Sequence, residues 1–333
     1  MPSASPASSP VASPSLERLG GADRIAAGLE GGGYIPSRAI ATAVHVAAHL
    51  EKPILVEGSA GVGKTELALS VARWLDLPLV RLQCYEGLDE SKALYEWKYG
   101  KQLLYTQILK DRMSDVLRDA DGFEGAMARL HDFGDLFFSE QFLEPRPLLR
   151  ALRTEGGAVL LIDEVDKSDE EFEAFLLEVL SAHQVTIPEL GTVRADMPPV
   201  TFLTSNNTRD LGDALKRRCL HLHIPLPEAR LERRIVATRV PEAGEALRRQ
   251  LVDFVQQLRT LELRKLPSIS ETIDWARALV LLNASELERE LVRDTLNVLL
   301  KFEVDVERAD RELPALLAHS RREGGPAAAP RVA

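Results

Sequence analysis

A glycine-rich stretch near the start of the chain constrains the fold more than any other feature. It follows the apolar run 54–56 and reads Gly58-Ser59-Ala60-Gly61-Val62-Gly63-Lys64-Thr65. After it, Leu67, Val71 and Leu75 recur four residues apart, which predicts a helix with one buried face. A phosphate-binding loop of this pattern lies between a strand and a helix. The stretch therefore predicts an α/β fold that holds a nucleotide.

The loop offers three kinds of contact to a phosphate. Its glycines let successive backbone N–H groups turn inward, and the N-terminus of the next helix adds partial positive charge. Lys64 is placed to contact the β- and γ-phosphates, and the Thr65 hydroxyl can ligate Mg²⁺. We therefore expect ATP and Mg²⁺ as cofactors. The alternative, a glycine-rich turn that matches by accident, leaves the flanking strand and helix unexplained.

A second motif follows the apolar run 158–162, where Asp163 and Glu164 end a predicted buried strand. This arrangement resembles a Walker B motif. A carboxylate at the carboxyl end of a parallel strand faces the ligand crevice, so Asp163 is expected to hold Mg²⁺, directly or through water. Glu164 is suited to orient or deprotonate the attacking water, which predicts hydrolysis. The alternative is a pair of solvated acids that begin a loop.

Two further elements complete the predicted catalytic set. The apolar run 200–204 is followed by Asn206, whose amide could position the same water, although an Asn that merely ends a strand is the alternative. Arg217 and Arg218 precede the run 220–224, where an arginine could project toward the γ-phosphate of a neighbouring subunit. Arg218 is favoured over Arg217. The alternative is a solvated basic helix end that offsets the helix dipole.

The apolar runs between 54 and 224 are separated by helical patterns, which predicts a mainly parallel five-stranded sheet flanked by helices. Past 225–227 only helical patterns remain. They span 228–240, 245–261, 268–282 and 285–302. Three capping boxes are expected to begin helices, at Ser168–Glu171, Ser268–Glu271 and Ser285–Glu288.

These patterns divide the chain of 333 residues into four predicted segments. A disordered tail rich in Pro, Ser and Ala covers 1–20, and an α/β nucleotide-binding domain covers 21–227. A smaller all-helical lid domain covers 228–320, and a disordered tail covers 321–333. The two-domain division agrees with the length, which exceeds the usual size of one domain.

Composition excludes several classes of partner and site. The net charge of -10 argues against a broad surface for nucleic acid, and no apolar run reaches the ~20 residues that a membrane helix needs. Cys84 and Cys219 are too few for a disulfide framework, so a cytoplasmic location is expected. His221 and His223 alternate on a predicted strand, but no third ligand stands at a spacing suited to metal.

The order of these motifs, with a helical region after them, resembles AAA+ ATPases. Further stretches are similar to the MoxR-type branch and, within it, to the CoxD-like proteins named for carbon monoxide dehydrogenase maturation. The stretches lie at 81–90, 93–97, 101–105, 175–178 and 185–192, and the resemblance covers residues 34 to 285. The last two look like the helix and hairpin that precede the sensor strand of that branch.

The resemblance implies an ATPase that forms a ring, expected to be a hexamer. It implies chaperone-like remodelling in metalloenzyme maturation, with a carbon monoxide dehydrogenase-like molybdenum hydroxylase as client and a von Willebrand A-domain protein as partner. One feature departs from the branch. Where many MoxR-type lids carry an arginine that senses the γ-phosphate, this chain reads Ser268-Ile269-Ser270-Glu271. Either another basic residue such as Arg277 substitutes, or lid closure is less tightly coupled to hydrolysis.

Two other functions stay open from the residues alone. One is a nucleotide-gated switch between assembly states with little hydrolysis, which the missing lid arginine would suit and Glu164 argues against. The other is a small-molecule kinase built on the same loop. The adjacent acids Asp163 and Glu164 and the pair Arg217 and Arg218 favour the ring ATPase over the kinase.

Overall fold

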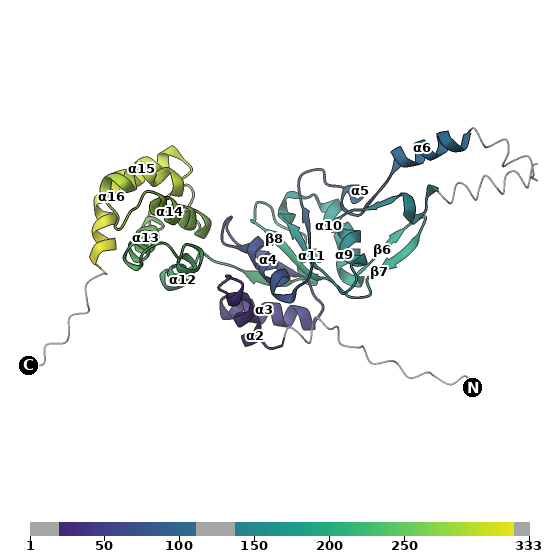
Figure 1. The fold of residues 1–333 in the computed structure, drawn as a ribbon, viewed down its shortest axis with the longest axis horizontal. Coiled ribbons are helices and arrows are strands. Elements are labelled where there is room, and N and C mark those ends of the chain that lie inside the picture. The colour runs from purple at the N-terminus through teal and green to yellow at the C-terminus, as the bar shows by residue number, and fades with distance from the viewer. Residues whose placement is uncertain (1–19, 111–136, 323–333) are drawn as a thin grey trace, which may run out of the picture. The chain divides into compact units, whose positions relative to one another are not determined.

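The computed structural model describes residues 20–110 and 137–322 (Figure 1), and the described chain forms two compact units. Of the described residues, the first unit contains 20–22, 42–55, 71–110 and 137–221, and the second contains 23–41, 56–70 and 222–322. Of the tails predicted at 1–20 and 321–333, residues 1–19 and 323–333 lie outside the described residues, and residues 321 and 322 end the last helix. The domain boundary after residue 227 stays a prediction.

A five-stranded sheet forms the centre of the α/β part, in the order β2-β5-β8-β1-β9. The pairs β2–β5 and β5–β8 are parallel, which confirms the predicted mainly parallel sheet with flanking helices. The strands are β1 (Ile54–Glu57), β2 (Leu79–Gln83), β5 (Val159–Asp163), β8 (Val200–Ser205) and β9 (Leu220–His223). Every residue of β5 is buried, as expected for a strand with neighbours on both edges and helices on both faces.

The register between β2 and β5 places Gln83 opposite Asp163. Because both strands run in the same direction, their carboxyl ends lie at one edge of the sheet, and β8 ends there too. The residues that follow β5 and β8 therefore come together within the first unit. This edge carries the acidic part of the candidate site.

Helices pack on the sheet around an apolar core. They include α3 (Arg38–His49), α4 (Lys64–Leu75), α9 (Pro147–Arg153), α10 (Glu170–Ala182) and α11 (Asp213–Arg218). In the first unit Leu160, Ile162 and Leu203 from the strands pack with Leu176 and Phe172 from α10. Burying each such side chain stabilises the fold by about 1.5–3 kcal/mol.

The N-terminus of α10 differs from the prediction. Asp169 is the N-cap, and its carboxylate accepts a hydrogen bond from the backbone N–H of Phe172 at 2.8 Å. The Ser168 hydroxyl instead donates to Val165 O at 2.7 Å. The Ser168 capping box was therefore wrong, because this hydroxyl completes the preceding turn and leaves the cap to the next residue.

The first unit also contains two antiparallel strand pairs and several short helical turns. The hairpin implied by the family resemblance is present as β6 (Gln184–Ile187) and β7 (Gly191–Arg194), which pair antiparallel. A second antiparallel pair joins β3 (Tyr95–Trp97) to β4 (Leu143–Pro145). Single turns occur at α5 (Glu90–Ala93), η1 (Glu140–Phe142) and η2 (Val165–Lys167), and α6 (Tyr99–Lys110) follows β3.

The C-terminal region is all helical, as predicted, and Figure 1 shows its helices gathered in one bundle. They are α12 (Ala229–Arg239), α13 (Glu245–Leu258), α14 (Ile269–Leu281), α15 (Arg289–Leu299) and α16 (Glu303–Arg322). Trp275 and Phe254 are fully buried at its centre, 5.3 Å apart between ring centroids. A buried ion pair between Glu232 of α12 and Arg259, at 2.7 Å, ties the first helix to the end of the second.

Two helix ends test the remaining capping predictions. The capping box of Ser268 and Glu271 is present at α14. The box of Ser285 and Glu288 was wrong, because α15 begins later and Glu288 is itself the N-cap. Within the described ranges, no helix combines the length and apolar composition required to cross a membrane.

Candidate nucleotide site

The predicted phosphate loop turns sharply after β1, and its glycines adopt conformations that other residues rarely adopt. The φ angles of Gly58, Gly61 and Gly63 are +152°, +80° and +98°. A Cβ on Gly58 would stand 2.3 Å from Ile224 O, and one on Gly61 would stand 2.1 Å from the Ser268 hydroxyl. A side chain at either position would therefore clash as well as strain the backbone.

Lys64 begins α4 and lies inside this loop with only 6% of its surface exposed. Its ammonium donates to Gly58 O at 2.7 Å and to Ser59 O at 2.9 Å. Thr65 follows on the first turn of α4 and is half-buried, whereas Ser59 and Ala60 are exposed and Val62 is buried. A helix N-terminus, a curled glycine loop and a fixed ammonium together form a cradle suited to phosphate groups.

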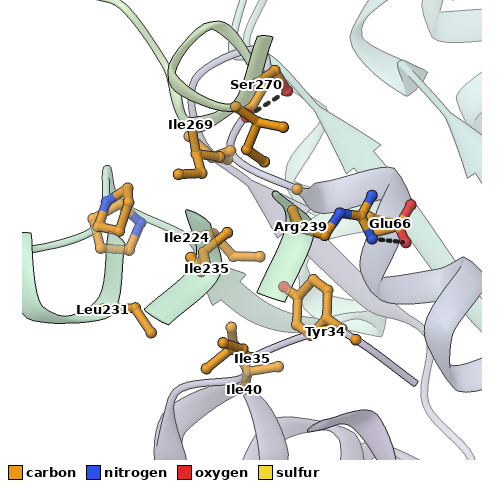
Figure 2. Close-up of a pocket in the computed structure, with 17 residues that line it drawn as sticks. Tyr34, Ile35, Ile40, Glu66, Ile224, Leu231, Ile235, Arg239, Ile269 and Ser270 are labelled. Carbon is orange, nitrogen blue, oxygen red and sulfur yellow. Dashed lines mark hydrogen bonds and ion pairs between the residues drawn. The ribbon is translucent and has the colours of Figure 1, made fainter. Parts of the chain in front are cut away.

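A cavity of about 200 Å³ opens beside this loop within the second unit (Figure 2). Its wall is mostly apolar, with side chains from the segment before the sheet and from the helical region. The lining includes Tyr34, Ile35, Ile40, Gly61, Val62, Gly63, Glu66, Ile224, Leu231, Ile235, Arg239, Ile269, Ser270 and Ile273. Cavities of this kind bind flat organic groups, with a few polar side chains that fix orientation.

Polar side chains of this cavity are held in place by contacts with one another. Arg239 of α12 lies 3.2 Å from the Glu66 carboxylate, and Figure 2 shows this pair beside Tyr34. Burial, and then the nearby charge of Glu66, raises the pKa of Tyr34 above its usual range. The phenol therefore stays protonated and remains a hydrogen-bond donor at neutral pH.

The N-terminus of α14 contacts the phosphate loop directly. The backbone N–H and the hydroxyl of Ser270 donate to Gly61 O at 3.2 and 3.0 Å. Arg277, named above as a substitute for the missing lid arginine, instead pairs with Asp274 at 3.4 Å and is exposed. The basic side chain that the helical region brings to the cavity is Arg239.

In the first unit, Asp163 ends β5 with its side chain 4% exposed. One carboxylate oxygen accepts a hydrogen bond from the Thr204 hydroxyl at 2.5 Å, and the other accepts one from the Arg81 guanidinium at 2.5 Å. Arg81 also donates to the side-chain oxygen of Gln83 at 2.7 Å. Oxygen donors of this kind are the ligands that Mg²⁺ prefers, so the donor set fits the predicted ion.

Glu164 has a left-handed backbone, with φ of +57°. Its backbone N–H donates to the Thr204 hydroxyl at 2.9 Å. The carboxylate accepts from Gln83 at 2.8 Å and from Lys167 at 2.6 Å on one oxygen, and from Asn206 at 3.3 Å on the other. The fold therefore brings Glu164 and Asn206 together, although they stand far apart in the sequence.

Asp166 stabilises the loop after β8 at this edge of the sheet. Its carboxylate accepts hydrogen bonds from the Thr208 hydroxyl at 2.6 Å and from the backbone N–H groups of Thr208 and Asn206 at 3.0 and 3.2 Å. Burial alone would raise the pKa of Asp166, but these hydrogen bonds outweigh it and hold the pKa below its usual range. Asp166 therefore fixes the loop that presents Asn206.

Arg217 and Arg218 end α11 and are both exposed. Arg218 donates to the Ser181 hydroxyl at 2.5 Å and lies 3.4 Å from Ala214 O. The proposed reach of either arginine to a second subunit stays a prediction. Among the residues that the structure describes, His221 and His223 belong to no group of three ligand-type side chains that could hold a metal.

Sequence reasoning missed the residues that surround the two acids, above all Arg81, Gln83 and Lys167. A signal for Gln83 was present, since a polar residue directly follows the segment 79–82, in which three of the four residues are apolar. Polar side chains at the carboxyl end of one parallel strand lie beside those of its neighbour. Only the strand order, however, shows that β2 and β5 are neighbours.

The chain is similar to several known proteins. Uncharacterised proteins of Staphylococcus aureus strains USA300 and NCTC 8325 are each 24% identical over 260 residues, covering 75% of this chain and 85% of theirs. Solved structures with some likeness include the Thermotoga maritima RuvB Holliday junction branch migration motor, with 15% identity, a TM-score of 0.43, and coverage of 93% of this chain and 82% of that one. A protein of Cytophaga hutchinsonii, provisionally named an ATPase, has 16% identity, a TM-score of 0.44, and coverage of 92% and 96%. Residues 53–219, which include the phosphate loop and both acids, match the AAA domain family of the dynein-related subfamily, and the chain belongs to this family of ATPases.

Proposed function

We propose that the chain binds ATP with Mg²⁺ and hydrolyses it, with Glu164 as the general base. The observation that supports this most is the cluster at the edge of the sheet, where Asn206 lies 3.3 Å from the Glu164 carboxylate and Asp163 immediately precedes that acid. A purely structural pair of acids would not require an amide from another strand. The family match adds support for nucleotide-dependent activity.

The glycines, Lys64 and Thr65 of the phosphate loop each have a part in this proposal. The glycines allow backbone N–H groups to face the phosphates, and the Lys64 ammonium exchanges its contacts with Gly58 O and Ser59 O for phosphate oxygens. Thr65 and Asp163 would hold Mg²⁺, which neutralises charge on the β- and γ-phosphates when bound. The cavity beside the loop would take the adenine and ribose, because its apolar wall suits a flat ring.

Glu164 accepts the proton of the attacking water, and Asn206 orients that water against it. In the nucleotide-free chain, the same carboxylate oxygen is bound by Gln83 and Lys167. Glu164 must therefore leave at least one of these partners before it can accept a proton there. This restraint would keep basal hydrolysis slow for as long as Gln83 and Lys167 both hold that oxygen.

We further propose a MoxR-type role, in which a ring of subunits, expected to be a hexamer, remodels a client metalloenzyme. The stretches 81–90, 93–97, 101–105, 175–178 and 185–192 support this by their resemblance to CoxD-like proteins. A carbon monoxide dehydrogenase-like molybdenum hydroxylase is the proposed client, and a von Willebrand A-domain protein the proposed partner. The second candidate function, an assembly switch with little hydrolysis, is favoured by the contact of Ser270 with Gly61, where an arginine is absent.

Binding of ATP is tested first with Lys64→Ala. This variant should lose ATP binding in calorimetry while its circular dichroism stays unchanged, because it lacks the only fixed cation of the loop. Equal ATP affinity in the variant and the wild type would contradict the proposed site.

The ring is tested by mixing two inactive variants. Arg218→Ala should reduce turnover far more than ATP affinity, because a trans arginine stabilises charge that develops in the transition state. Rings assembled from Arg218→Ala and Lys64→Ala subunits should recover part of the activity. Full activity of Arg218→Ala alone would exclude this arginine, and Arg217→Ala is the matched comparison.

A further inference from the structure

Arg81 lies across the strand edge from the proposed magnesium ligand. It stands on β2, two residues before Gln83, so both side chains leave the strand on the same side. Its guanidinium donates hydrogen bonds to one carboxylate oxygen of Asp163 at 2.5 Å and to the side-chain oxygen of Gln83 at 2.7 Å. The Arg81 side chain is 52% exposed, whereas that of Asp163 is 4% exposed.

The Asp163 carboxylate is buried and needs compensation of its charge, whereas the Arg81 guanidinium that provides it is half exposed. An ionised carboxylate buried to this degree is costly unless a cation or several donors compensate it. The Thr204 hydroxyl, which is buried, supplies one neutral donor to Asp163 at 2.5 Å. Arg81 supplies a positive charge, from a long side chain that is half exposed to solvent.

Asp163 cannot keep both cations on the same oxygen. Mg²⁺ binds carboxylate oxygens at about 2.0–2.1 Å, so a guanidinium nitrogen at hydrogen-bond distance from that oxygen would stand within roughly 4–5 Å of a divalent ion. Like charges at such a distance repel strongly. The Arg81 guanidinium lies on a flexible, half-exposed side chain, whereas the Thr204 hydroxyl is fixed in β8.

We propose that Arg81 is a placeholder for Mg²⁺: it neutralises Asp163 in the nucleotide-free chain and competes with the ion for that carboxylate. The proposal rests on the proposed function of the site. It extends that function, because Arg81 also contacts Gln83, whose amide donates to Glu164 at 2.8 Å. Departure of Arg81 from Asp163 thus removes a restraint from the side chain that holds the catalytic base, which links loading of the site to release of Glu164.

The test measures how the affinity for nucleotide depends on Mg²⁺. Calorimetry gives the affinity for the non-hydrolysable analogue adenosine 5′-(β,γ-imido)triphosphate at a series of Mg²⁺ concentrations. Arg81→Gln removes the competing charge, so the Mg²⁺ concentration that gives half of the full gain in analogue affinity should fall about fivefold. This is the scale expected for an ion pair with one half-exposed partner. Arg81→Lys should stay near the wild type, because it keeps a cation in reach of Asp163. The matched control is Arg153→Gln, which removes an ion pair with Glu140 at 2.7 Å elsewhere in the same unit.

A second measurement separates this role from simple packing. In EDTA, Arg81→Gln should melt at a lower temperature than Arg153→Gln, because buried Asp163 loses a charge that compensates it. Saturating Mg²⁺ with the analogue should remove most of that difference. An unchanged or higher Mg²⁺ requirement in Arg81→Gln would overturn the proposal. If the wild type bound the analogue without any dependence on Mg²⁺, the proposed function would fail as well. Failure of the Arg81 proposal alone is therefore seen in the variant, and failure of the proposed function is seen in the wild type.

Discussion

The Lys167 ammonium lies 2.6 Å from the carboxylate of Glu164, three residues earlier in the chain. The hydrogen bond to Glu164 raises the pKa of Lys167, so the ammonium stays charged throughout the neutral range. In the proposed mechanism this ion pair competes with the water for the base. Lys167 therefore restrains the reaction without being required for it.

Removal of this restraint should accelerate hydrolysis. Lys167→Met is expected to raise basal turnover by about two- to fivefold, the range of one exposed ion pair, and to leave ATP affinity unchanged. Phosphate release under saturating ATP measures the effect. Lys92→Met is the matched control, since Lys92 pairs with Asp89 at 3.1 Å with similar spacing and exposure but away from the acids. A drop in turnover specific to Lys167→Met would mean that the ammonium assists catalysis.

The phosphate loop should tolerate no side chain at Gly61. Gly61→Ala would place a Cβ 2.1 Å from the Ser268 hydroxyl at a φ of +80°, so ATP affinity should fall by at least about tenfold. Gly87→Ala separates the two causes, because Gly87 has φ of +78° but no atom within 4 Å of the added Cβ. It should lose stability only modestly and bind ATP normally. Equal affinities in the two variants would argue against a tight loop.

The buried thiols predict a specific alkaline instability. Burial, and then the charges of Asp163, Asp166 and Glu164, raises the pKa of Cys84 from 9.0 to about 12, and burial raises that of Cys219 likewise to about 12. A raised pKa in the folded state favours the protonated thiol, so this stability is fully present below about pH 9 and is lost as the pH rises toward 12. The free energy of unfolding should therefore fall across this range, and less steeply in Cys84→Ala/Cys219→Ala.

The same burial predicts unreactive thiols in the native state. Iodoacetamide at pH 8 should leave both cysteines unmodified in the folded chain and modify them after unfolding, because the thiolate is the reactive form. Mass spectrometry of the labelled protein measures this directly. Rapid labelling of folded Cys84 would show that the thiol is more accessible than its buried position indicates.

Much of the fold could be predicted because its core strands are continuous apolar runs. The run before Asp163 is buried throughout, and the glycine loop is specific enough to fix the order of strand, loop and helix. Helix ends were harder to place. Ser168 and Asp169 are adjacent residues that both favour caps, and only the hydrogen bond of Ser168 to Val165 O decides between them.

Other features depend on strand order and on packing, which the residues do not show. No helix was predicted past residue 302, yet α16 runs through Pro314, a residue that usually interrupts a helix. The predicted acids and Asn206 could be found because each follows an apolar run. The partners of these acids could not, since Arg81 and Gln83 reach Asp163 and Glu164 only through the pairing of β2 with β5.

The most direct test of the central claim is single-turnover phosphate release by Glu164→Gln. The substitution keeps the shape and the hydrogen bond to Asn206 but removes the base, so turnover should fall by roughly 10² or more while ATP still binds. Calorimetry with ATP on the same preparation shows whether binding survives. Retained binding with strongly reduced phosphate release is the predicted result, and near wild-type release from Glu164→Gln would contradict the assignment of Glu164 as the base.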